Sequence, residues 1–127
     1  MHKLLNPPTA PKPFSRYSQG VEVEPGKRWL HIAGQVGVAP DGTLRQGAEA
    51  QHEQCWQNLK AILAAAGMTT QDLVKITIFI TTPDQVALSR VVRARNLEGA
   101  QPASPLLVVA GLATPELKVE IEAIAAA

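Results

Sequence analysis

The sequence predicts one α+β domain whose β-sheet carries two helices on one face. Apolar residues recur at every second position in residues 73–81 and 119–124, which is the period of a strand with one apolar face. From about Gly47 the apolar residues recur at every third or fourth position, which indicates an amphipathic helix. Turn residues separate these stretches. The elements are therefore expected in the order ββ-α-β-α-ββ.

The chain divides into an N-terminal extended arm, residues 1–16, and a single domain, residues 17–127. Four of the ten prolines lie in the arm, at Pro7, Pro8, Pro11 and Pro13. Proline lacks a backbone donor and fixes φ, so this density favours extended, irregular chain. The domain is long enough for one core, to which a subunit interface would add much buried area.

The first half of the domain predicts two or three antiparallel strands followed by a helix. Residues 17–23 alternate in polarity, and residues 28–38 are rich in apolar and β-branched side chains. After a turn at Asp41-Gly42, the helix shows its apolar positions at Cys55, Leu59, Ile62 and Ala66. Gly67 is expected to end this helix.

The second half predicts a strand, a helix and two further strands. The strand covers residues 73–81, and Thr82-Pro83-Asp84-Gln85 has the pattern of a capping box that begins a helix reaching about Asn96. The apolar run 106–110 and the closing strand follow. In the closing strand, Glu120 and Glu122 share one face, which either meets water or lines a polar pocket.

Composition limits the possible partners and compartment. Twelve basic and eleven acidic residues give a formal net charge of +1, so no overall field attracts nucleic acid or an anionic membrane. The lone Cys55 excludes an internal disulfide. No stretch has the length of a signal peptide or a membrane span. We therefore expect a soluble, cytoplasmic protein without membrane or nucleic-acid partners.

Two strands are too apolar to leave one face of the sheet in water. The runs 106–110 and 30–34 show little polar alternation, which predicts that both sheet faces are covered. Two helices can cover only one face. The other face is expected to meet another subunit, although long loops are an alternative cover.

Four segments in order resemble the Rid family, also called the YjgF or L-PSP endoribonuclease-like family. They are Tyr17-Ser18-Gln19-Gly20, residues 32–36, residues 58–67 and residues 119–125. The resemblance implies a chorismate-mutase-like fold with a mixed sheet, a homotrimer with a central β-barrel, and ligand clefts between subunits. It also implies hydrolysis of reactive enamines and imines to keto acids and ammonia.

The resemblance carries over to the site residues only in part. It implies that Glu120 orients or activates the attacking water and that Tyr17 lines the cleft. Gly34, also retained, is expected with Tyr17, Arg90 and Ser104 among the substrate-binding residues. The family's deaminating members have an arginine directly after the Pro-Ala pair, and this chain has Ser104 there. A serine hydroxyl cannot replace a guanidinium that clamps a carboxylate. Arg90, which aligns approximately with an asparagine of the family, could restore the positive charge.

Each of these positions also has a structural interpretation. Glu120 and Glu122 could belong to a solvated face or pair with Lys118 and an arginine across the interface, and Tyr17 could be a strand-edge aromatic. Arg90, Arg93 and Arg95 could lie on a solvent-facing helix with salt bridges. His52 and Cys55 lie three residues apart on the first helix, but no third ligand is suggested, so no metal is expected. No nucleotide-binding glycine loop appears, and no cofactor is expected.

The sequence leaves three hypotheses about function. The first is a hydrolytic deaminase of enamines, imines or related small molecules, with a substrate altered by Ser104. The second is a non-catalytic trimer that binds or senses a small-molecule ligand in the same clefts. The third, RNA cleavage, is the least favoured, because aromatic residues make up only 4% of the chain and the charge is balanced.

Overall fold

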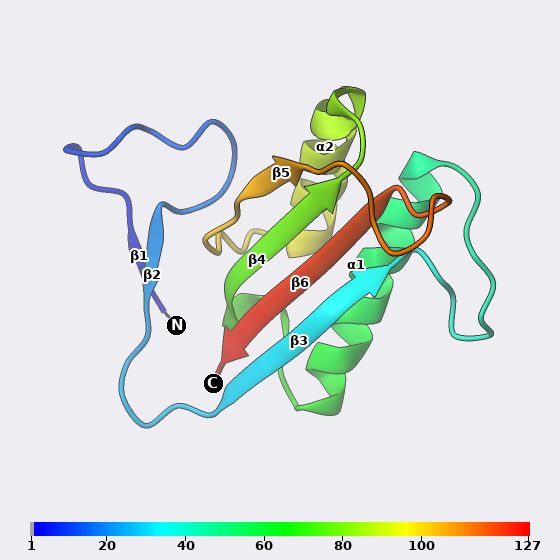
Figure 1. Cartoon of the computed structure of the whole chain (residues 1–127). Helices are drawn as coiled ribbons and strands as arrows, with labels where there is room; N and C mark the ends of the chain where they lie inside the picture. The colour runs from blue at the N-terminus through cyan, green and yellow to red at the C-terminus, as the bar shows by residue number, and fades with distance from the viewer. Residues whose placement is uncertain (1) are drawn as a thin grey trace.

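The computed structural model describes residues 2–127 and contains a four-stranded sheet backed by two helices (Figure 1). The sheet has the order β3-β6-β4-β5, in which β4 and β5 are parallel and the other pairs are antiparallel. Its elements are β3 (Trp29–Val36), α1 (Ala48–Ala65), β4 (Leu73–Ile80), α2 (Val86–Leu97), β5 (Leu106–Val108) and β6 (Val119–Ala126). The α+β class and the mixed sheet are confirmed.

A second, two-stranded sheet stands beside the main one and corrects the expected strand pairing. It joins β1 (Lys3–Leu5) to β2 (Gly20–Glu22) in antiparallel register. β2 therefore pairs with a strand of the arm and not with β3, whose partner is β6. Figure 1 shows this small sheet set apart from β3 by an extended connection. The proline-rich arm therefore includes a short strand, and its separation from the domain at residue 16 stays a prediction.

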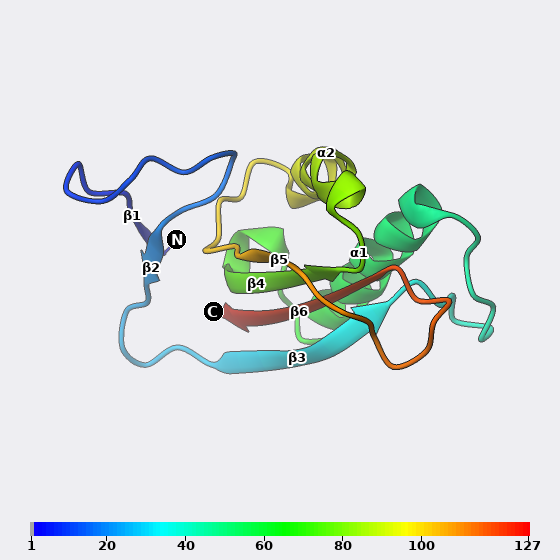
Figure 2. The same ribbon diagram turned by 45° about the horizontal axis from the view of Figure 1, so that its top comes forward.

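The core lies between the main sheet and the two helices, which cover the same face (Figure 2). Alternate residues of β4 and β6 point toward the helices and are buried, whereas the residues between them are more exposed. Burying each such side chain contributes roughly 1.5–3 kcal/mol. The largest of the fully buried side chains include Trp56, Leu59, Leu63, Ile76, Ile78, Ile80 and Ile121.

The helix boundaries agree with the sequence at α1 and differ from it at α2. Gly67 follows α1 with φ of 70°, a left-handed conformation that favours glycine. Before α2, however, residues Pro83–Gln85 form a short 3₁₀ helix, and Thr82 makes no capping bond to the backbone. Its hydroxyl instead accepts a hydrogen bond from the Gln85 side chain at 3.1 Å. The predicted capping box is wrong because Gln85 turns inward toward His52.

The face of the main sheet that points away from the helices is uncovered within one chain. Lys75 and Glu122 are exposed there, and Leu107 retains 43% of its accessible surface. The run 106–110 forms only the three-residue strand β5. Coverage of both sheet faces is therefore not achieved by one chain, and coverage by another subunit stays a prediction. None of the helices in residues 2–127 is long and apolar enough to cross a membrane.

His52 is buried between α1 and the turn before α2. Its Nε2 lies 2.9 Å from Oε1 of Gln85, whose amide nitrogen donates to Thr81 and Thr82. Oε1 must therefore accept, and the Nε2 of His52 carries the proton. Its Nδ1 has no partner among residues 2–127. Burial lowers the pKa of His52, an effect that the bond to Gln85 opposes.

This arrangement predicts that protein stability falls as the pH drops below about 6.5. In the unfolded chain His52 takes up a proton near its ordinary pKa, whereas in the fold its lowered pKa keeps it neutral. The unfolded state then binds more protons, and the free energy of unfolding falls by at most about 1.4 kcal/mol per pH unit from this group. Urea titrations between pH 7.5 and 5.5, at one protein concentration, measure this.

The matched variants are His52→Gln and His31→Gln, since His31 is exposed. We expect His52→Gln to flatten the pH dependence in this range and His31→Gln to leave it unchanged. An equally steep dependence in His52→Gln would show that another group is responsible.

Candidate functional site

A pocket of about 620 Å³ at the β5 edge of the sheet brings together three of the five residues singled out in the sequence. These are Tyr17, Arg90 and Ser104. Five further polar residues of the lining were not predicted as site residues, namely Ser15, Ser18, Gln19, Lys75 and Arg93. The walls come from the end of the arm, from α2, and from the chain that leads into β5.

Arg93 is the most buried charged residue of this pocket. Its accessible surface is 2% of the maximum, and its Nη1 donates to the Ser104 hydroxyl at 3.0 Å. Its Nη2 donates to the hydroxyl of Ser15 in the arm. The Arg93 Cζ atom also lies 5.7 Å from the centre of the Tyr17 ring, within the range of a cation–π contact. One guanidinium thus joins α2 to two distant parts of the chain.

Backbone hydrogen bonds hold Ser104 and Tyr17 in their places. The Ala103 amide donates to the Val74 carbonyl at 3.0 Å, and the Ala103 carbonyl accepts from Ile76 at 2.8 Å. On the other side, the Ser18 amide donates to the Pro102 carbonyl at 3.1 Å. The segment before β5 therefore lies between β4 and the end of the arm, which presents Ser104 and Tyr17 to the same space.

The pocket is cationic. Among the described residues, its lining includes Lys75, Arg90 and Arg93 but no aspartate or glutamate. Burial lowers the pKa of Arg93, and the neighbouring charge of Arg90 lowers it further, whereas Tyr17 acts in the opposite sense. An arginine stays protonated under such conditions. The site therefore favours an anion over a cation.

Gly34 and Glu120, the other two predicted site residues, contact each other outside this pocket. A Cβ atom on Gly34 would lie 1.9 Å from Oε2 of Glu120 and 2.6 Å from its Cδ. Only a glycine leaves room for this carboxylate, which is half-buried over β3. Within residues 2–127 the Glu120 carboxylate makes no salt bridge, so the expected alternative of a pair with Lys118 is not realised in one chain.

Side chains of α1 fix the two strands that carry Gly34 and Glu120. The amide nitrogen of Gln51 donates to the carbonyls of Arg45 and Glu116, and its oxygen accepts from the Lys118 amide at 2.8 Å. The amide of Asn58 donates to the Val36 carbonyl at 3.2 Å. These bonds set the end of β3 and the start of β6, where Gly34 and Glu120 meet.

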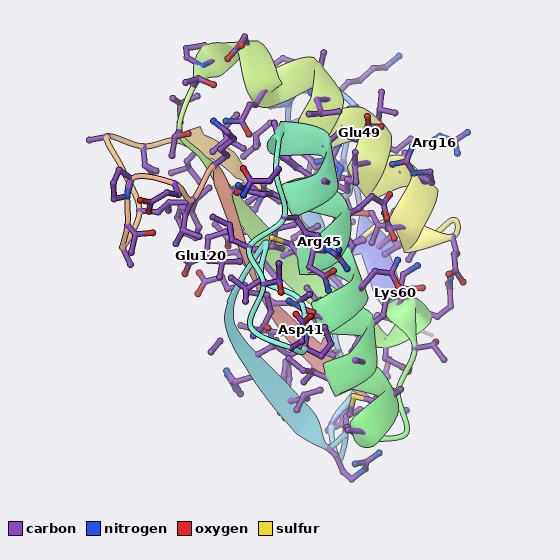
Figure 3. All side chains as sticks on the ribbon, turned by 90° about the vertical axis from the view of Figure 1, so that its right-hand side faces the viewer. Arg16, Asp41, Arg45, Glu49, Lys60 and Glu120 are labelled. Carbon is purple, nitrogen blue, oxygen red and sulfur yellow. The ribbon has the colours of Figure 1, made fainter. Side chains whose placement is uncertain are left out.

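Glu120 and the cationic pocket are separated within one chain. Glu120 is not among the residues that line the pocket, and it pairs in the sheet with Val36 and Phe79. Figure 3 shows Glu120 on the opposite side of the molecule from Arg16, the neighbour of Tyr17 in the arm. One chain therefore brings Tyr17, Arg90 and Ser104 together and leaves Gly34 and Glu120 apart from them.

The remaining candidates of the sequence have structural partners. The Cys55 thiol donates to the Val119 carbonyl at 3.8 Å, and burial together with the Glu120 charge raises its pKa to about 12. Within residues 2–127 no cluster of three or more potential metal-ligating side chains occurs. Arg95 does not line the pocket and pairs with Glu53, to which its Nε donates at 2.8 Å.

The sequence placed Arg93 in a basic helix but did not predict it as a site residue. Its three-residue spacing from Arg90 put both on one face of α2. Nothing in that spacing indicates which of the two turns inward. Its burial depends on Ser104 and Ser15, which lie 11 and 78 positions away.

Comparison with known proteins assigns the chain to a family. The model described as "Endoribonuclease L-PSP" matches residues 7–127, and the chain therefore belongs to this family. The solved structures that resemble it include YyfB from Yersinia pestis, a member of the Rid family, with 35% identity, a TM-score of 0.86, and coverage of 98% of this chain and 97% of that one. The Rid family and its fold, both expected from the sequence, are confirmed.

Two further relatives have more specific names. A mouse protein named 2-iminobutanoate/2-iminopropanoate deaminase is 33% identical over 127 residues, which cover 98% of this chain and 91% of the mouse protein. The structure of Escherichia coli TdcF with bound serine is 31% identical, with a TM-score of 0.73 and coverage of 97% of each chain.

The close approach of Gly34 to Glu120 predicts coupled effects of substitution. Gly34→Ala should lower the free energy of unfolding by about 1–3 kcal/mol, because the whole Glu120 side chain must move away. In a Glu120→Ala background most of this cost should disappear. Urea titrations of the four proteins of this double-mutant cycle, at one protein concentration, measure the coupling.

Gly111→Ala serves as the control, since a Cβ there meets nothing within 4 Å. It should change stability by no more than about 0.5 kcal/mol. If Gly34→Ala costs the same with and without the Glu120 carboxylate, the steric role assigned to Gly34 is wrong.

Proposed function

We propose that this protein is a hydrolytic deaminase of small reactive imines and enamines that acts at clefts between the subunits of a homotrimer. Membership of the Rid family and the name of the mouse relative support this activity. The observation that carries the proposal is the Glu120 carboxylate, which is half-buried over Gly34 and free of any salt bridge within residues 2–127. A carboxylate in this condition is free to accept a proton from water.

The uncovered sheet face supports the oligomer. Leu107 and Glu122 are exposed on it, and Phe79 and Ile124 are only partly buried. The two edges of the sheet, β3 and β5, have no further strand beside them within residues 2–127. A ring of three such sheets covers the bare face and brings the β5 edge of one chain beside the β3 edge of the next, which removes the free edges.

This arrangement completes the site across a subunit boundary. The cationic pocket lies at the β5 edge of one chain, and Gly34 lies on β3 of the next, with Glu120 packed over it. Residues that are separated in one chain then face the same cleft. The pocket holds the substrate, and Glu120 acts on the water.

The chemistry follows from these two parts. An enamine first takes a proton from solvent at carbon and becomes an iminium ion, the protonated form of the imine. The water oxygen then forms a bond to the imine carbon while the Glu120 carboxylate accepts a proton from that water. In the resulting carbinolamine, Glu120 returns this proton to the nitrogen and the carbon–nitrogen bond breaks to release ammonia. As the carbonyl forms, the hydroxyl proton passes to the Glu120 carboxylate and from there to solvent. One water is consumed for each ammonia released.

The decisive variant is Glu120→Gln, which keeps the size of the side chain but cannot take up the proton. We expect ammonia release from enzymatically generated 2-aminoacrylate to fall roughly 100-fold or more. Glu98→Gln is the matched control, because Glu98 is exposed at the C-terminal end of α2, outside the pocket and away from the bare face of the sheet. It should retain the activity of the unmodified protein.

Unchanged turnover in Glu120→Gln would exclude this carboxylate as the base. If the unmodified protein itself releases no more ammonia than buffer does, the deaminase proposal is wrong. The second candidate, a non-catalytic ligand-binding trimer, is then favoured by the replacement of the family's clamp arginine by Ser104. Calorimetric binding without product would support it.

A further inference from the structure

We infer that Arg93, reaching the pocket from helix α2, binds the carboxylate of the substrate in place of the arginine that Ser104 replaces. The substrate class is then a small 2-imino monocarboxylate, and this identification rests on the proposed deaminase function. The sequence pointed to Arg90 as the substitute. The geometry instead favours Arg93, whose Nη1 lies 3.0 Å from the Ser104 hydroxyl, at the position where the family's arginine would begin.

The first argument is the missing counter-charge. Arg93 is 2% exposed, and no carboxylate within residues 2–127 forms a salt bridge with it. A buried charge without a partner is costly, and proteins normally pair it. The other charged residues that line the pocket, Lys75 and Arg90, are also cations. An anion supplied by the ligand satisfies this requirement.

The second argument is the free hydrogen-bonding capacity of the guanidinium. Its Nε is buried and has no partner among residues 2–127. Its two Nη atoms donate to the neutral hydroxyls of Ser104 and Ser15. A carboxylate that takes the place of the Ser15 hydroxyl exchanges a neutral acceptor for a charged one, and charge-assisted bonds of arginine to carboxylate are the stronger kind.

The third argument is that the guanidinium is held in one orientation. The centre of the Tyr17 ring lies 5.7 Å from the Arg93 Cζ atom, and Nη1 donates to the Ser104 hydroxyl at 3.0 Å. The planar fork is therefore already oriented before a ligand arrives, which reduces the entropy lost on binding. Arg90 lacks these restraints, because it is exposed and makes no hydrogen bond or salt bridge within residues 2–127.

The test uses a ligand pair that differs only in charge. The dissociation constants of 2-oxobutanoate, the type of keto acid that the reaction would release, and of its neutral amide 2-oxobutanamide are measured by titration calorimetry on the full-length protein. We expect the unmodified protein to bind the acid at least about tenfold more tightly than the amide. In Arg93→Gln this preference should disappear, with amide binding little changed.

Two variants separate binding from folding. Arg93→Lys retains the positive charge without the fork, and it should keep part of the preference for the acid. Arg95→Gln removes a charge from the same helix at a residue that pairs with Glu53 outside the pocket, and it should keep the full preference. If Arg93→Gln fails to fold, the acid preference of Arg93→Lys, compared with that of the unmodified protein, still tests the inference. Unchanged acid preference in Arg93→Lys and Arg93→Gln, or no preference in the unmodified protein, would overturn the inference.

The two proposals fail in different ways. Acid binding that depends on Arg93 but is accompanied by no ammonia release contradicts the deaminase and supports the carboxylate site. Ammonia release that continues in Arg93→Gln, with the acid preference intact, supports the deaminase and contradicts the role of Arg93.

Discussion

One constraint shapes this protein: two helices cover a four-stranded sheet on one face only (Figure 2). The covered face supplies the core, in which alternate residues of β4 and β6 are buried. The bare face carries the residues that lie between the buried ones along each strand, and Glu120 and Glu122 are among them. Because strand residues alternate between faces, the pattern that builds the core also determines which side chains lie on the bare face, where the proposed trimer places a neighbouring subunit. Folding and the proposed site therefore depend on the same two-residue period.

The halves of the proposed site are held by different means. Glu120 is positioned by the regular sheet, by the absence of a side chain on Gly34, and by the Gln51 amide that fixes the start of β6. The cationic pocket is positioned by irregular chain, in which Arg93 ties α2 to Ser104 and to Ser15 of the arm. In the proposed site, the carboxylate thus lies on a regular strand, whereas the group proposed to bind the substrate connects a helix to irregular chain.

Much of the fold could be predicted from the sequence because it depends on local periodicity. The helix ending before Gly67 and the strand over residues 73–80 follow from spacing alone. The pairing of β1 with β2 could not be predicted in this way. It joins the proline-rich arm to a strand about 17 residues further along the chain, and local periodicity does not indicate such pairing. The prediction of a capping box at Thr82 was wrong, because the Gln85 side chain is bonded to the buried His52. Likewise, the spacing of Arg90 and Arg93 indicated a shared face, but Ser104 and Ser15 decide which one is buried.

The most direct test of the shared site is complementation between inactive subunits. Arg93→Gln and Glu120→Gln chains, each inactive alone, are co-expressed in equal amounts and purified as mixed oligomers, and ammonia release from 2-aminoacrylate is measured. If each site takes Arg93 from one chain and Glu120 from the next, random assembly leaves both groups intact in about a quarter of the sites, and that fraction of the normal activity should return. Activity no higher than that of either variant alone would contradict a site built from two chains.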